Sequence, residues 1–383
     1  MSAAQWRRAM NTRAGGAAAP LRPAPPAPVL AHDIADDPEA NAPAVLRWLW
    51  RNVTARHFFG MVTLLLLPFV ASPFVTFQVA SQSLALGLIA LSLTFLGGYG
   101  GMVSLAQMTV AGISGYAVAI LCTSSGAASA SLGWPWWIGI PAAVLIAVLC
   151  ATLIGWLSVR TEGIYTIMIT LAIGVAFYYL VLQNYSVFNG FQGLREVYPP
   201  KVLDIAWREP LPFYLLCLAC ALAGYALVRH VVRAPFGIAL QGIRDNPRRM
   251  SALGFNVVAH RVAAYALAGL LAAVGGVLLV WYNGLITPGS VSMWWLINIL
   301  VIAVLGGMKR PIGAFAGALV FVLLQTFAID MLGGGARERF NLIIGGVFLA
   351  IVLFSPDGLL GLWAMLRSRF ARKADVHQPR RQA

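Results

Sequence analysis

Uncharged apolar stretches, each long enough to cross a lipid bilayer, recur along almost the whole of this sequence. Between Phe58 and Gly98, for example, there is no Asp, Glu, Lys or Arg. An α-helix rises about 1.5 Å per residue and the hydrocarbon core of a bilayer is about 30 Å thick, so roughly 20 apolar residues make one span. We therefore expect an all-α polytopic membrane protein.

Composition excludes a water-soluble enzyme of this size. Of the 383 residues, 60% are hydrophobic and only 10% are charged, whereas soluble domains carry about 25% charged residues. The net charge of +14 would indicate nucleic-acid binding in a soluble protein. Here the basic residues lie between and outside the apolar stretches, which favours a role in membrane orientation and no nucleic-acid partner.

The apolar stretches predict about ten transmembrane helices once the longest is divided at Pro73. The segment 102–123 is rich in Ser, Thr, Gln and Gly and has a second interpretation as a re-entrant segment. We predict a disordered N-terminal extension over 1–56, a membrane domain over 57–363 and a basic tail over 364–383. The predicted spans are 57–75, 78–97, 103–123, 135–158, 164–187, 211–230, 262–283, 291–307, 312–331 and 340–363.

The distribution of basic residues orients these spans. With ten spans, 22 of the 27 Lys and Arg residues fall on the side of both termini and five on the other side. Cytoplasmic loops carry the excess of Lys and Arg, so both termini are predicted to be cytoplasmic. The five on the opposite side are Arg195, Lys201, Arg208, Arg337 and Arg339.

No catalytic or metal-binding pattern is present in the sequence. No Asp, Glu, Lys or Arg lies in the middle of a predicted span, and no Cys/His set has metal spacing. There is no G-x-x-x-x-G-K-[ST] loop, so an ATP-driven process would need another polypeptide for its nucleotide site. We expect a protein that is not an enzyme and has no cofactor or metal. A carrier coupled to ions and working without ATPases remains an alternative, and a membrane-embedded enzyme is disfavoured.

The most informative loop is 233–256. Pro235 opens a short helix with an apolar side, and Asn246 caps a second helix that has Pro247 at its first position and Gly254 just past its end. The predicted hairpin lies beneath the membrane. It is either a coupling element that inserts into a partner or a solvated amphipathic connector. Its apolar side would be formed by Ile238, Leu240 and Ile243, followed by Met250 and Leu253, with Arg244, Arg248 and Arg249 projecting.

Polar side chains within the apolar segments form a second group of candidates. The helix over 103–123 carries hydroxyl and amide groups that have no reason to face lipid. They either bond to neighbouring helices or line a path for a polar solute. The group comprises Ser104, Gln107, Thr109 and Ser114, with Tyr165, Thr166, Thr170, Asn298 and Gln325 as weaker candidates.

The 233–256 loop resembles the signature of the inner-membrane permeases of branched-chain amino acid ABC importers, the hydrophobic amino acid uptake family. Residues 234–246 read A-P-F-G-I-A-L-Q-G-I-R-D-N, against S-P-F-G-R-A-L-x-A-I-R-D-N in the family. Three further segments match in the same order: G-Y-G-G-M-V-S-L-A-Q at 98–107, R-T-E-G-I-Y at 160–165, and L-G-G-M with P-I-G-A within 305–314. The resemblance covers about residues 58–365 and is to the second, longer permease subunit.

This resemblance implies a type II ABC importer-like permease in the bacterial inner membrane. The implied partners are a second homologous permease, two cytoplasmic ATP-binding subunits and a periplasmic solute-binding protein, besides membrane lipid. The implied cargo is branched-chain amino acids, with urea, short amides or aromatic acids as alternatives. The outer loop 188–210, which has mixed charge, is either a docking site for the solute-binding protein or an ordinary solvated loop. ATPase coupling is assigned to Pro235, Gly237, Leu240, Ile243, Arg244, Asp245, Asn246 and Gly254. The translocation path is assigned to Ser104, Gln107, Tyr165, Thr166, Thr170 and Asn298.

Overall fold

A computed structural model of the chain describes residues 72–123, 131–161, 163–200 and 207–332, together with eight further positions between 68 and 361. Within these residues, five helices are long and apolar enough to cross a membrane. The first is one continuous helix made of η2 (Val75–Ser81), α4 (Gln82–Thr94) and η3 (Phe95–Tyr99). The others are α6 (Trp136–Ser158), α7 (Ile164–Gln183), α9 (Pro210–Arg233) and α12 (Val257–Asn283).

These five helices confirm the prediction of an all-α membrane protein. Each coincides with a predicted span to within five residues at either end. Most of each of the predicted spans 57–75 and 340–363 lies outside the described residues, and the terminal segments 1–56 and 364–383 lie wholly outside them. The total of ten spans therefore stays a prediction.

The predicted span 103–123 contains a shorter helix. The α5 helix runs from Gln107 to Cys122, only 16 residues, and the segment 101–106 before it is not helical. Non-helical backbone at membrane depth is tolerated only where protein or a water-filled cavity surrounds it. Residues 104–106 satisfy this condition because they are buried.

The predicted spans 291–307 and 312–331 correspond to two helices that meet at a sharp bend. The α13 helix (Met293–Gly306) has only 14 residues, about 21 Å at the usual rise, and α14 (Pro311–Leu332) follows at a bend of 117°. The pair forms either one broken span or a re-entrant loop. Hydropathy detects the apolar residues of both helices but carries no information on their direction.

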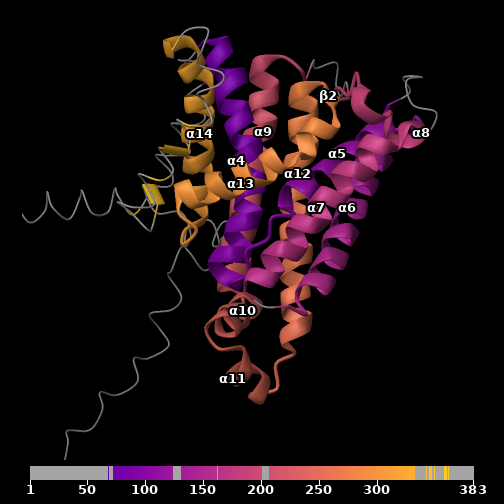
Figure 1. Cartoon of the computed structure of the whole chain (residues 1–383). Helices are drawn as coiled ribbons and strands as arrows, with labels where there is room; N and C mark the ends of the chain where they lie inside the picture. Colours follow the sequence, from indigo (N-terminus) through magenta and orange to yellow (C-terminus); the bar gives the residue numbers. More distant parts are fainter. Residues whose placement is uncertain are drawn as a thin grey trace, which may run out of the picture. The chain divides into compact units, whose positions relative to one another are not determined.

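Small elements lie at the two ends of the helices (Figure 1). At one end, β1 (Leu194–Arg195) pairs antiparallel with β2 (Leu285–Ile286), beside α8 (Tyr185–Phe188), η4 (Gly190–Gln192) and η5 (Pro288–Val291). We call this the sheet end. At the hairpin end lie α10 (Pro235–Asp245) and α11 (Pro247–Ala252).

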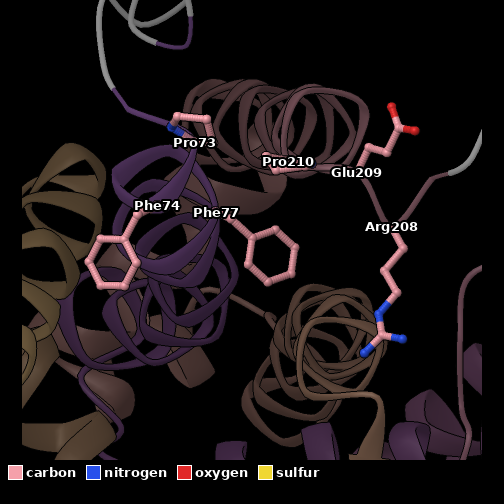
Figure 2. A pocket seen from close by; sticks show the side chains of 6 residues that line it. All are labelled: Pro73, Phe74, Phe77, Arg208, Glu209 and Pro210. Carbon is pink, nitrogen blue, oxygen red and sulfur yellow. The ribbon is translucent and has the colours of Figure 1, made fainter.

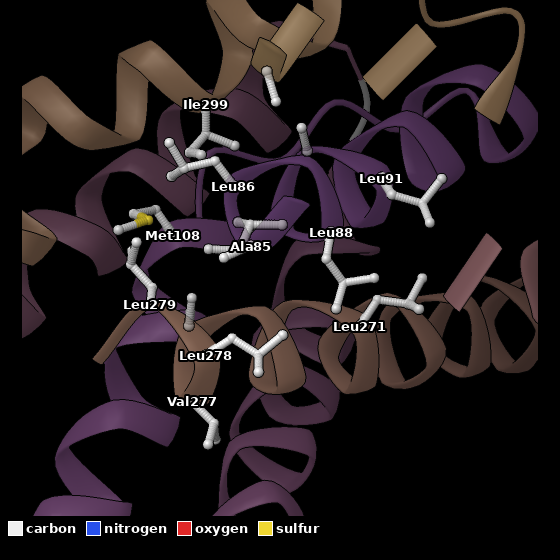
Figure 3. Close-up of a cluster of buried hydrophobic side chains, with 14 of the residues drawn as sticks. Ala85, Leu86, Leu88, Leu91, Met108, Leu271, Val277, Leu278, Leu279 and Ile299 are labelled. Carbon is white, nitrogen blue, oxygen red and sulfur yellow. The ribbon is translucent and has the colours of Figure 1, made fainter. Parts of the chain in front are cut away.

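The core is built around α4 and α12. In the most apolar window of each, 94% of the helix containing α4 and 67% of α12 are buried, against only 22% of α7. Figure 3 shows Leu88 of α4 on the side of Leu271 and Leu278 of α12, and Leu86 on the side of Ile299 of α13. The outer helices α6 and α7 expose large apolar side chains such as Leu149, Leu153 and Met168, as expected of surfaces that meet lipid or another subunit.

Candidate functional site

The α10 helix turns sharply from the end of α9 and packs one face against the spans. Pro235 occupies its first turn, where a missing N–H costs nothing. Leu240 and Ile243 are fully buried. Gly237 is required at the corner, because a Cβ there would overlap the carbonyl oxygen of Val231.

The α11 helix confirms the sequence prediction. Asn246 is its N-cap, and its Oδ1 accepts a hydrogen bond from the Arg249 backbone N–H at 3.0 Å. Pro247 takes the first helical position, and Gly254 has φ of +91° just after the helix ends. The hairpin 235–254 is thus specified locally, by caps and turn residues.

The predicted apolar side of the hairpin is only partly correct. Ile238 is 63% exposed and Leu253 is 66% exposed, whereas Leu240 and Ile243 are buried. At about 100° per residue, position 238 lies nearly opposite position 240 on a helix. Two large apolar side chains therefore face outward from the hairpin, together with the exposed Arg248.

Arg244 differs from the expectation that it projects toward a partner. Its Nη1 donates a hydrogen bond to the Gly98 carbonyl oxygen at 2.6 Å. Its Nε donates to Asp245 Oδ1 at 2.9 Å, and Nη2 lies at the same distance from that oxygen. The side chain is 38% exposed. Arg244 thus connects α10 to the end of the first described span.

The partner of Arg244 is a turn of sequence Gly-Gly-Tyr-Gly-Gly at 97–101, which we call the glycine turn. Gly101 has φ of +67°, and a Cβ built on it would lie 2.5 Å from Arg244 Cγ. On its other side the turn touches the segment before α14, where a Cβ on Gly98 would overlap the Met308 carbonyl oxygen. The sequence shows the run of glycines but not these two neighbours, because nothing in the local pattern encodes a contact so distant in the chain.

The non-helical segment 101–106 is held by hydroxyl groups. Thr170 Oγ1 of α7 accepts a hydrogen bond from the Leu105 N–H at 3.1 Å, and Ser104 Oγ accepts from the Ala106 N–H at 3.3 Å. Thr170 Oγ1 also lies 3.0 Å from the carbonyl oxygen of Thr166. The structure therefore brings three of the predicted path residues, Ser104, Thr166 and Thr170, to one helix break.

The side chains of the remaining predicted path residues have other surroundings. Gln107 is buried, and its Oε1 accepts a hydrogen bond from Ser92 Oγ of α4 at 3.0 Å. Asn298 is buried on α13 with its Nδ2 unpartnered among the described residues. Tyr165 is 69% exposed. Sequence reasoning missed Ser92, although it is a hydroxyl in an otherwise apolar stretch. The assignment of these residues to a path stays a prediction.

Cavities open between described residues at the sheet end. Figure 2 shows one, of about 590 Å³, lined by Phe74 and Phe77 at the start of the first described helix and by Arg208, Glu209 and Pro210 at the start of α9. A second, of about 400 Å³, has Trp134, Trp136, Trp281 and Glu196 in its wall. The Arg208 guanidinium stacks 4.1 Å from the centre of the Tyr198 ring. The described residues contain no group of three or more His, Cys, Asp or Glu side chains suited to a metal ion.

Comparison with known proteins places this arrangement in a family. The family model described as the permease component of branched-chain amino acid transport systems matches residues 75–352. The chain is 23% identical to the high-affinity branched-chain amino acid transport permease LivM of Escherichia coli K12, over 80% of this chain and 76% of that protein.

Two further relatives have shorter or weaker matches. The LivH permease of the same Escherichia coli strain is 24% identical over 72% of this chain and 90% of its own length. The nucleoside ABC transporter permease NupC of Lactococcus lactis is 30% identical over 32% of this chain and 37% of its own length. No solved structure matches the chain. Since the family model covers well over half of the sequence, this multi-pass membrane protein belongs to the permease family of branched-chain amino acid ABC transporters.

Proposed function

We propose that this chain is the longer permease subunit of an ABC importer that moves branched-chain amino acids across the bacterial inner membrane, driven by partner ATPases. Its similarity to LivM over most of both chains supports this proposal. The proposal includes about ten spans in a type II arrangement, a permease domain over 57–363, and cytoplasmic termini at 1–56 and 364–383.

The observation that carries the proposal is the α10–α11 hairpin. It is anchored to the spans by buried Leu240 and Ile243, yet it presents Ile238, Leu253 and Arg248 outward. Apolar side chains beside cations at a surface outside the bilayer are what a protein partner would cover. A subunit with no nucleotide-binding loop of its own must receive the work of ATP hydrolysis through such a surface.

The proposed assembly has three kinds of partner. A second homologous permease completes the membrane part, two ATP-binding subunits dock on the hairpin end, and a solute-binding protein docks on the sheet end. Closure of the ATPases on ATP would push the hairpin and rock the spans between inward- and outward-facing states. The solute would pass the helix break at 101–106, where Ser104, Thr166 and Thr170 gather.

The docking surface can be tested by charge substitution. In Leu253→Asp, a carboxylate would have to be desolvated at the interface, so recovery of the ATPases with the purified permease should fall by about tenfold or more. Phe191→Asp is the matched control, because Phe191 is a 75% exposed apolar residue at the sheet end. It should leave ATPase recovery unchanged. Equal recovery with both variants, each at normal membrane levels, would contradict docking at the hairpin.

Transport itself should be measured in proteoliposomes holding the full complex and the solute-binding protein. Uptake of labelled leucine should require internal ATP and all the subunits. Labelled urea, a short amide, an aromatic acid and a nucleoside should be carried poorly in comparison. Ion-driven uptake by the chain alone would overturn the ABC mechanism in favour of a secondary carrier. Preference for another solute would change only the cargo.

A further inference from the structure

We propose that Arg244 is a positioning residue that fixes the α10–α11 hairpin to the glycine turn, so that displacement of the hairpin is passed to α4 and α14 together. This inference rests on the proposed ATPase coupling but goes beyond it. In the sequence interpretation, Arg244 reaches outward to the ATPase. In the structure it reaches inward.

The guanidinium is oriented from two sides. Asp245 Oδ1 holds Nε and Nη2, both at 2.9 Å, and this leaves Nη1 directed at the Gly98 carbonyl oxygen at 2.6 Å. Hydrogen bonds from a charged donor are shorter and stronger than neutral ones. The Asp245 carboxylate therefore orients the guanidinium for its hydrogen bond to Gly98, a residue 146 positions away in the chain.

The stem of Arg244 adds a packing contact to this bond. Gly101, at φ of +67°, brings its backbone against the side chain, with its ideal Cβ position 3.3 Å from Arg244 Cβ. One turn earlier on α10, buried Leu240 lies 3.9 Å from the corresponding position on Gly100. Leu240 and Arg244 of α10 thus pack against Gly100 and Gly101. Because of these contacts, we expect α10 and the glycine turn to move together.

The glycine turn leads to two different parts of the core. On one side it ends the helix that contains α4, whose most apolar window is 94% buried. On the other, the ideal Cβ position of Gly97 is 3.1 Å from Met308 Sδ, and Met308 lies three residues before α14. Packed elements transmit strain rather than absorb it. A push on α10 therefore reaches the central helix and the α13–α14 bend at the same point.

The close approach of Gly101 and Arg244 allows a rescue experiment. Disulfides form between residues whose Cβ atoms are about 3.5–4.5 Å apart, and the 3.3 Å spacing here needs only a small shift. The Gly101→Cys/Arg244→Cys double variant would be made with Cys122, Cys150, Cys217 and Cys220 replaced. In its reduced form this variant lacks the hydrogen bond from Arg244 to Gly98. In its oxidised form a disulfide between positions 101 and 244 replaces that connection.

The readout is leucine transported per ATP hydrolysed by the full complex, measured in proteoliposomes. In the reduced double variant, transport per ATP should fall about tenfold below that of the chain lacking only the four native cysteines, within the range of typical coupling energies. Oxidation of the double variant should recover most of this loss. Gly101→Cys and Arg244→Cys as single variants should not respond to oxidant. An oxidised double variant that stays at the reduced level would overturn the proposal.

Arg244→Gln is a second variant that leaves the glycine turn intact. It should lower transport per ATP while the ATPases still co-purify at the normal level. Wild-type transport per ATP in this variant would overturn the inference, as would loss of ATPase binding, which would place Arg244 in direct contact with the ATPase. Failure of the proposed function looks different, because then the ATPases would not bind the wild-type permease at all.

Discussion

At the scale of single residues, Thr170 replaces a helical hydrogen bond that the chain cannot make. In a continuous helix the Leu105 N–H would donate to a carbonyl four residues earlier, but residues 101–104 are not helical. The hydroxyl of Thr170, which belongs to α7 and is fully buried, accepts the hydrogen bond from the Leu105 N–H instead. A break in a span is stable only when such groups supply the missing partners.

Thr170→Val removes this acceptor while keeping the shape of the side chain. The Leu105 N–H would be left buried without a partner, so the free energy of unfolding should fall by about 1–3 kcal/mol. The measurement is the apparent melting temperature of the detergent-purified protein. Thr170→Ser keeps the hydroxyl and should stay much closer to wild type. A valine variant as stable as the serine variant would mean that water replaces the hydroxyl.

At the scale of elements, the α13–α14 bend depends on close backbone contact between glycines. A Cβ on Gly306 would overlap the Gly313 carbonyl oxygen, and one on Gly317 would overlap that of Ile302. Because backbone atoms cannot move aside as a side chain can, Gly317→Ala should cost about 1–3 kcal/mol of stability. Leu319→Ala, on the exposed side of α14, should cost less. The melting temperatures of both purified variants test this prediction. Equal losses of stability in the two variants would argue against tight backbone packing at Gly317.

The sequence predicts those elements whose signals are local. Asn246, Pro247 and Gly254 define the ends of α11 through their own caps and backbone preferences, and apolar length locates the five long helices to within a few residues. The α13–α14 bend and the shortened α5 escape prediction, because hydropathy measures how apolar a segment is and not where it turns. The Arg244–Gly98 contact escapes for a related reason: it is made only once α10 and α4 have packed.

At the scale of the whole molecule, the distribution of basic residues between the two ends of the helices predicts how the protein is oriented in the membrane. The exposed Arg248 and Arg249 lie at the hairpin end, which the positive-inside rule places in the cytoplasm. Arg195 and Arg208 lie at the sheet end, in the group of five basic residues predicted outside. The coupling proposal requires this orientation, since ATP is available only in the cytoplasm.

Single cysteines and a membrane-impermeant maleimide test the orientation directly. With the four native cysteines replaced, Arg248→Cys should be labelled in inside-out vesicles and protected in spheroplasts. Phe191→Cys, 75% exposed at the sheet end, should show the reverse pattern. Each variant is the other's control, because accessibility alone would label both from either side. Labelling of Arg248→Cys from outside would put the hairpin beyond the reach of any ATPase, and the coupling role of α10 and α11 would then have to be abandoned together with the role of Arg244.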